Sequence, residues 1–144
     1  MKLKHHLARL VAIGALAGAG WLGVTSTASA SASWCDYAPG PGNVNKSCVD
    51  VHGSGEYVTE VDGNLDASDY PYEPSEVCGV TVHVFGIFAD GAHYSDTGGD
   101  SGCALGDIEE SFYPQGDFQA GSLLCETTEW QGQTSRPVCI TIES

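Results

Sequence analysis

Basic residues are almost missing from this chain beyond residue 30. Of its five lysines and arginines only Lys46 and Arg136 lie there, together with all 19 acidic residues, so the net charge of that part is about −17 with neutral histidine. Nucleic acid is held through its phosphates by clustered lysine and arginine, and anionic membrane surfaces attract the same residues. We therefore expect neither nucleic acid nor membrane among the partners.

No apolar run in the sequence is long enough to cross a bilayer. The apolar segment 10–24 has about 15 residues rich in Ala and Gly, whereas a spanning helix needs about 20. It follows a basic start and precedes small residues at a cleavage site, Ala28-Ser29-Ala30, the pattern of a secretory signal peptide. We therefore expect residues 1–30 to be removed and residues 31–144 to form one secreted, extracellular domain.

The Cys-x-x-Cys spacing of zinc sites is absent, and no histidine lies near a cysteine at ligand spacing. Zinc bound through cysteine is therefore not expected. An even number of cysteines in a short exported chain indicates disulfides. The six cysteines, all beyond the leader, are Cys35, Cys48, Cys78, Cys103, Cys125 and Cys139.

Turn signals suggest how these cysteines pair. When the cysteines are taken in consecutive pairs, the midpoints fall on Pro41-Gly42, Asp90-Gly91 and Gly132, which are residues typical of turns. Antiparallel strands joined by a tight turn place residues that are equidistant from it opposite each other. The sequence therefore predicts sequential pairing, with a break in register near Gly98-Gly99 in the middle pair: Cys35–Cys48, Cys78–Cys103 and Cys125–Cys139.

Helical periodicity is missing, whereas alternating apolar residues predict several short strands. We expect strands around 49–52, 57–61, 77–88, 92–94, 123–128 and 138–142. The 77–88 run is apolar on both faces and should be central, with Cys78 on the face of Val80, Val82 and Val84. The expected fold is all-β, a small antiparallel β-sandwich stapled by three disulfides, for which an immunoglobulin-like layout is plausible and a small barrel is the alternative.

The segment Gly99-Asp100-Ser101-Gly102 resembles the sequence around the nucleophile of trypsin-like serine proteases. The resemblance covers four residues. It would imply two β-barrels and a histidine in an Ala-Ala-His-Cys context, and the chain is about half that size and has no such histidine. We interpret the segment as a turn, which these residue types favour, and expect no catalytic residues and no enzyme.

Oxygen-bearing side chains alternate along Asp62-Gly63-Asn64-Leu65-Asp66, and Glu73 falls at the twelfth position. This spacing resembles the calcium loop of EF-hands. Ala67 replaces the glycine of the sharp turn, and no helical pattern flanks the segment. We therefore expect no cofactor, with weak calcium binding in an acidic loop as an alternative whose ligands would be Asp62, Asn64, Asp66 and Asp69.

Aromatic residues near expected loops suggest a recognition surface. In Tyr70-Pro71-Tyr72-Glu73-Pro74 the prolines restrict the loop that carries two tyrosines, so less conformational entropy is lost on binding. Tyr70, Tyr72 and Trp130 are the candidate contact residues, and aromatic faces with acidic neighbours suit a sugar or a cationic protein. The alternative is that these rings fold back onto a small core.

The sequence therefore predicts a non-catalytic extracellular protein that binds an unknown protein or glycan through its loops. One alternative is a secreted protease inhibitor. The segment between Cys125 and Cys139 would then be the inhibitory loop, with Arg136 entering an acidic specificity pocket and Pro137 opposing cleavage. A calcium-binding domain and a small hydrolase are the other classes considered, and no turnover is expected.

Overall fold

The computed structural model describes residues 31–38, 45–67 and 76–144, and within them every regular element is a strand. The expected all-β fold is therefore confirmed. Tyr70, Tyr72, Asp69 and Glu73 lie outside the described residues. The strands are β1 (Ala32–Tyr37), β2 (Lys46–Ser54), β3 (Tyr57–Asp66), β4 (Glu76–Ile87), β5 (His93–Leu105), β6 (Asp107–Phe112), β7 (Gly116–Asp117), β8 (Leu123–Trp130), β9 (Gln133–Thr134) and β10 (Val138–Thr141).

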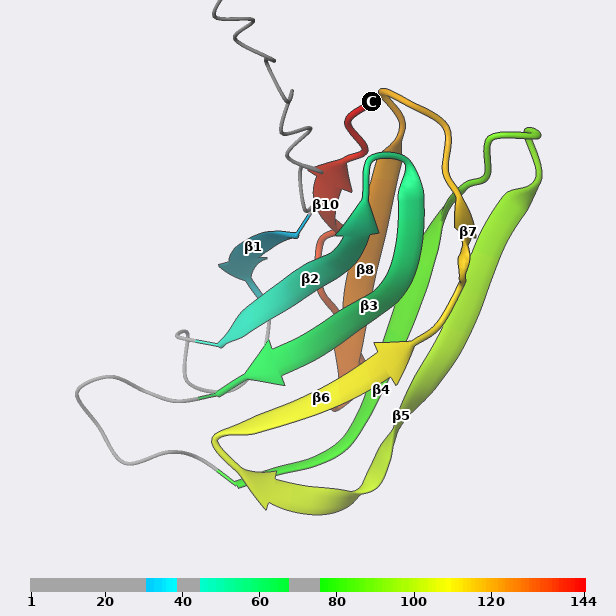
Figure 1. Ribbon diagram of the computed structural model, residues 1–144. Coiled ribbons are helices and arrows are strands. Elements are labelled where there is room, and N and C mark those ends of the chain that lie inside the picture. The colour runs from blue at the N-terminus through cyan, green and yellow to red at the C-terminus, as the bar shows by residue number, and fades with distance from the viewer. Residues whose placement is uncertain (1–30, 39–44, 68–75) are drawn as a thin grey trace, which may run out of the picture.

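The strands form two antiparallel sheets packed face to face, so the predicted sandwich is confirmed (Figure 1). Sheet A has the order β1-β2-β3-β6, with β7 also pairing with β3, and sheet B has the order β10-β8-β4-β5, with β9 pairing with β8. The order is not that of an immunoglobulin domain, where the first sheet combines strands A, B, E and D. Here the first three strands follow one another in a meander, because each joins the next through a hairpin.

Aliphatic residues from the inner faces of both sheets make the core. Sheet A contributes residues such as Val49, Val61 and Leu65, and sheet B contributes Val82 and Leu124, all fully buried. Burial of one such side chain contributes about 1.5–3 kcal/mol to folding. On β3 and β4 the buried residues alternate with more exposed ones, so each outer face of the sandwich remains available to solvent.

The disulfides pair as the turn signals predict: Cys35 with Cys48, Cys78 with Cys103, and Cys125 with Cys139. Each joins directly opposed residues of neighbouring strands, with Cα atoms 4.0–4.1 Å apart. Such close spacing is typical of opposed residues that exchange no backbone hydrogen bonds. Each bridge therefore lies within a single sheet, one in sheet A and two in sheet B, and none connects the two sheets.

A β-bulge at Gly79 corrects two expectations for the central strand. The pairing of β4 with β5 shifts by one residue between Cys78 and Val80, whereas Gly98 and Gly99 lie in regular register. Gly79 has φ +66°, a conformation that a residue with a Cβ rarely adopts. Ser101 and Gly102 of β5 lie opposite the single residue Gly79, and the alternation of β4 breaks at Gly79, so Val77 is buried and Cys78 lies on the exposed face, opposite to the face of Val80.

Candidate functional site

A pocket lies where β1 and β10 meet at one side of the sandwich, and we name it the edge pocket. It has a volume of about 460 Å³, within the range of small-molecule and side-chain binding sites. In Figure 1 its strands lie together at the side where the chain ends. Its walls come from β1, from the β2–β3 hairpin and from the C-terminal segment, and include Trp34, Val51, Tyr57, Val58, Ile142 and Glu143.

The edge pocket follows from the strand order. β1 is the edge of sheet A and β10 is the edge of sheet B, and these two edge strands contact each other without pairing. On the opposite side of the sandwich the chain passes directly from β5 to β6 through Gly106, which brings those edge strands together in sequence. The sandwich is therefore closed by the chain on one side and open on the other.

Trp34 is the residue that marks this opening. It is opposite Val49 in the register of β1 with β2, so it projects from the inner side of sheet A, where a neighbour from sheet B would normally cover it. Because β10 ends the second sheet, 62% of Trp34 remains exposed. Sequence reasoning missed this residue. The signal that could have found it is its position one residue before Cys35, because the predicted Cys35–Cys48 bridge already places residue 34 on a strand.

Glu143 is the one charged side chain among the residues that line the edge pocket. The apolar members, including Val51 and Val58, belong to the core and are buried at their bases. An apolar cavity with an exposed aromatic ring and few polar groups can bind an apolar group and orient it through those polar groups. The arrangement has the features of a binding site.

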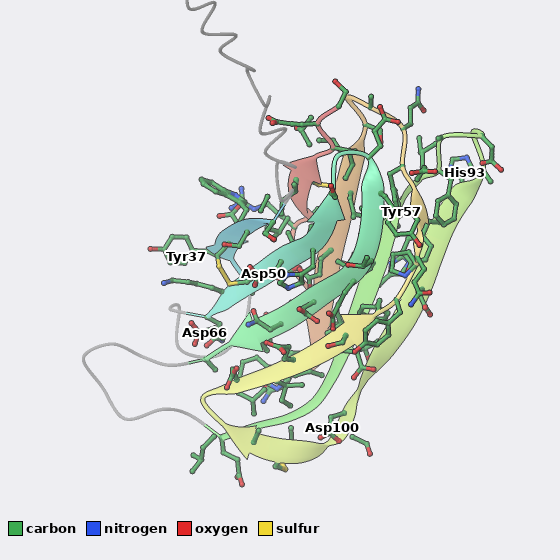
Figure 2. All side chains as sticks on the ribbon, in the orientation of Figure 1. Tyr37, Asp50, Tyr57, Asp66, His93 and Asp100 are labelled. Carbon is green, nitrogen blue, oxygen red and sulfur yellow. A yellow bond between two sulfur atoms is a disulfide. The ribbon has the colours of Figure 1, made fainter. Side chains whose placement is uncertain are left out.

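A second candidate surface is the outer face of sheet A, which is acidic. Pairing places Asp50 beside Asp62, Asn64 beside Glu109 and Asp66 beside Asp107, and Figure 2 shows Asp50 on β2 and Asp66 at the end of β3. Partial burial raises the pKa of Glu109, and the neighbouring charges of Asp62, Asp107, Asp50 and Glu60 raise it further. This face therefore carries mutually repelling carboxylates.

The alternative of a calcium loop is wrong in its geometry, because Asp62, Asn64 and Asp66 lie on strand β3. Residues two apart on a strand are about 6.6 Å apart and cannot curl around one ion as a loop does. His52 Nε2 lies 3.0 Å from Asp62 Oδ2, while Asp62 Oδ1 and Asn64 Oδ1 are buried without a hydrogen-bond partner in the described part of the chain. Calcium binding by these oxygens remains a prediction.

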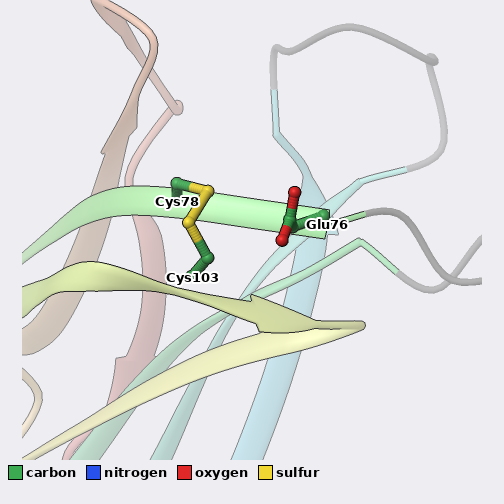
Figure 3. Close-up of side chains that lie close together, drawn as sticks. All are labelled: Glu76, Cys78 and Cys103. Atoms are coloured by element: carbon green, nitrogen blue, oxygen red, sulfur yellow. A yellow bond between two sulfur atoms is a disulfide. The ribbon is translucent and has the colours of Figure 1, made fainter.

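Three potential ligands for a metal also meet at Glu76, Cys78 and Cys103 (Figure 3). Both sulfurs of this group are joined in a disulfide, and a disulfide lacks the thiolate that binds a metal. The group is therefore a consequence of the bridge and does not form a metal site. No other group of three such ligands is this close within the described residues.

The structure buries one of the remaining predicted contact residues and exposes the other. Trp130 ends β8 beside the turn at Gln131 and Gly132, but its side chain is 4% exposed and packed in the core, which is the alternative outcome for this ring, so it is not available for contact. Arg136 is exposed, at 74% of its side chain, and its Nη2 atom lies 3.1 Å from Asp36 Oδ2. This ion pair links the segment before β10 to β1 beside the edge pocket.

The protease-like segment is also placed differently from the turn that was expected. Gly99 to Gly102 lies inside β5, opposite the bulge at Gly79, and Gly102 N donates to Asp100 Oδ1 at 2.7 Å. The nearby histidine of β4, His83, has its Nε2 atom 2.9 Å from Ser95 Oγ, not from Ser101. The segment therefore shapes a strand.

A buried carboxyl group lies between the sheets. Glu126 on β8 is fully buried and accepts a hydrogen bond from Ser47 Oγ at 2.6 Å, while its Oε1 atom has no partner in the described structure. Burial raises the pKa of Glu126 to about 8, although the Ser47 hydrogen bond opposes this shift. Thr128 Oγ1 donates to Ser47 Oγ at 3.2 Å, which completes a polar island in the core.

None of the described residues forms a helix long and apolar enough to span a membrane. Comparison with known proteins adds no name: no family model, no curated protein and no solved structure matches the chain.

Proposed function

We propose that this protein is a non-catalytic extracellular binding protein and that the edge pocket is its binding site. The observation that carries the proposal is the exposed Trp34 at an apolar pocket of about 460 Å³ between unpaired strand edges. Large aromatic side chains at such openings supply much of the energy of recognition. The described carboxylates serve solubility and steering of the partner rather than chemistry.

An extracellular location agrees with the disulfides. All six cysteines are bridged and none is free, as is usual in oxidising compartments. The signal-like residues 1–30 provide the route of export in this proposal.

The experiment is titration with Nile red, a neutral apolar dye, monitored through its own emission and through quenching of tryptophan fluorescence. Beyond residue 30 the tryptophans are Trp34 and the buried Trp130, so Trp34 reports on the pocket. Trp34→Ala should weaken binding about tenfold or more. The matched control is Tyr113→Ala, since Tyr113 is an aromatic of nearly equal exposure, 61%, that does not line the pocket. Equal affinity of wild type and Trp34→Ala would refute the proposed site.

Protease inhibition is the second candidate, and the exposure of Arg136 favours it. Arg136 lies between Cys125 and Cys139, which a disulfide joins, and within the described residues a surface ion pair with Asp36 holds its head group. Such exposed pairs contribute about 0–1 kcal/mol, so the carboxylate of a trypsin-like pocket could replace Asp36. An assay against trypsin-like and subtilisin-like proteases tests this candidate, with Arg136→Ala as the variant. Absence of inhibition at micromolar protein would eliminate it.

A further inference from the structure

The edge of β10 beside the pocket carries unpaired backbone groups. Ile142 N donates to Ser122 O at 2.9 Å, and Gly121 N donates to Ile142 O at 2.8 Å, so the backbone of Ile142 faces β8. In an antiparallel ladder the residues on either side of such a position direct their N–H and C=O groups away from the partner strand. Thr141 and Glu143 therefore present theirs at the free edge, and both residues line the pocket.

The alternation along this strand gives different residues different roles: Thr141 and Glu143 offer backbone groups at the edge, and Ile142 directs its side chain inward. Ile142 is buried, so a residue placed opposite it on an added strand would direct its side chain inward, toward Val51 and Val58 in the pocket wall. Residues on either side of that position would lie opposite Thr141 and Glu143. An extended peptide therefore uses the apolar cavity and the backbone edge together, whereas a small apolar molecule or a sugar uses the cavity alone.

This edge is also less protected than sheet edges usually are. Natural proteins cover edge strands or place lysine, proline or bulges on them. Pro137 directly precedes β10, but from Val138 to Ser144, where the pocket lies, the sequence has neither lysine nor proline. Its one charge is Glu143, in a protein whose net charge beyond residue 30 is about −17. A second copy would bring two such acidic edges together, whereas a basic segment would be attracted.

We propose that the edge pocket binds an extended, basic polypeptide segment as an added strand on β10. The backbone of the segment pairs with Thr141 and Glu143, one apolar side chain enters the cavity beside Trp34, and a flanking Lys or Arg faces Glu143. This inference rests on the proposed function, since it names the ligand class of the same pocket. β-strand addition of this kind derives affinity from main-chain hydrogen bonds and specificity from the pocket.

The probe is the peptide acetyl-Thr-Lys-Leu-Lys-Thr-amide, whose leucine would enter the pocket while a lysine lies opposite Glu143 in either strand direction. Its binding is measured by calorimetry and by Trp34 fluorescence. Thr141→Pro removes the outward N–H group and leaves the ladder with β8 intact, as proline on an edge permits. The matched control Thr141→Val keeps the N–H group. We expect about tenfold weaker binding to Thr141→Pro than to Thr141→Val.

Two further arms keep the proposal falsifiable if Thr141→Pro does not fold. A peptide methylated at the backbone nitrogens of the leucine and both lysines should bind wild-type protein about tenfold more weakly, because it cannot pair along the edge in either strand direction. Glu143→Gln should weaken the unmethylated peptide at low salt and flatten its salt dependence.

The outcomes separate the inference from the proposed function. If Trp34→Ala weakens binding of Nile red and peptide while methylation and Thr141→Pro change nothing, the pocket binds apolar groups and the added strand is refuted. If Trp34→Ala changes the affinity for neither Nile red nor the peptide, both proposals fail. Tight binding of a neutral oligosaccharide in place of the peptide, or a concentration-dependent dimer abolished by Thr141→Pro, would overturn the choice of a basic segment.

Discussion

The buried carboxyl group of Glu126 should make stability fall as pH rises. An exposed glutamate has a pKa of 4.5, and burial raises that of Glu126 to about 8 in the folded protein. Below pH 4.5 both states hold the proton, so Glu126 adds no pH dependence. Between these values only the unfolded chain releases it, and stability declines as pH increases. Above pH 8 both states are ionised and the decline ends.

The size of this effect follows from the difference between the two pKa values. A difference of about 3.5 pH units at 1.36 kcal/mol per unit corresponds to a loss of about 5 kcal/mol between pH 4.5 and 8. Small domains have a total stability of about 5–15 kcal/mol. Glu126, with its unpartnered Oε1 atom between the sheets, should therefore dominate the pH dependence of folding in this range.

The assay is urea unfolding with intact disulfides at several pH values from 4.5 to 8, monitored by fluorescence of the buried Trp130. Glu126→Gln should remove most of the slope and be the more stable protein at pH 8. Glu129→Gln is the matched control, because Glu129 is an exposed glutamate of the same strand and its replacement makes the same chemical change. Equal slopes for wild type and Glu126→Gln would refute the reasoning.

Three other perturbations follow from the structure. Gly63→Ala should destabilise by about 1–3 kcal/mol, because its Cβ would lie 2.5 Å from Val82 Cγ1 and 2.8 Å from Glu126 Cγ; denaturant unfolding compares it with Asn64→Ala on the outer face, and an unchanged midpoint would contradict the packing described. Cys125 and Cys139 are 14 residues apart in sequence, and replacing both by Ala should lower the free energy of unfolding by about 3 kcal/mol, measured by thermal and urea unfolding. A loss below about 1 kcal/mol would show that the bridge does not restrict the unfolded chain. If Asp62, Asn64 and Asp66 bind calcium, an ion concentration ten times the Kd should add about 1.4 kcal/mol of stability, visible as a higher Tm that the Asp62→Asn/Asp66→Asn variant lacks; a Tm unmoved by millimolar calcium would end that hypothesis.

The disulfide pattern could be predicted because it depends on local symmetry. Cys125 and Cys139 are equidistant from Gly132, and the hairpin turn at Gln131 and Gly132 has φ +52° and +73°, the two positive values that a tight type I′ turn requires. This turn pairs Trp130 with Gln133, and a shift of one residue between β9 and β10 then places Cys139 opposite Cys125. A turn of this kind aligns its flanking strands whatever the rest of the fold does. Asp90-Gly91 likewise turns the chain between β4 and β5, with a positive φ at Gly91 alone, +87°.

Other parts of the fold could not be predicted, because their causes are distant in sequence. β5 continues to Leu105 through Gly98 and Gly99, where intrinsic preference is weak and pairing with β4 decides the conformation. β1 and β6 were missed, since short edge strands owe their form to their partners. The irregularity at Gly79 reversed the expected facing of Cys78, and the alternation pattern of β4 does not reveal an extra residue in its partner strand β5.

The edge pocket was beyond sequence reasoning for a related cause. It exists because two strands more than 100 residues apart, β1 and β10, end their sheets on the same side. The loops expected to carry recognition were chosen for their aromatic residues, yet Trp130 is needed by the core. Which ring packs and which remains exposed depends on the sheet order, which local patterns do not contain.

The consecutive order of the three bridges bears on how the chain acquires them. Every cysteine is bonded to the next or the previous one along the sequence. A polypeptide that emerges from a translocon with its N-terminus first exposes each thiol immediately before its proper mate. Oxidation in order of emergence then produces the native set directly, and maturation of this protein should have little need of an isomerase that reshuffles wrong pairs.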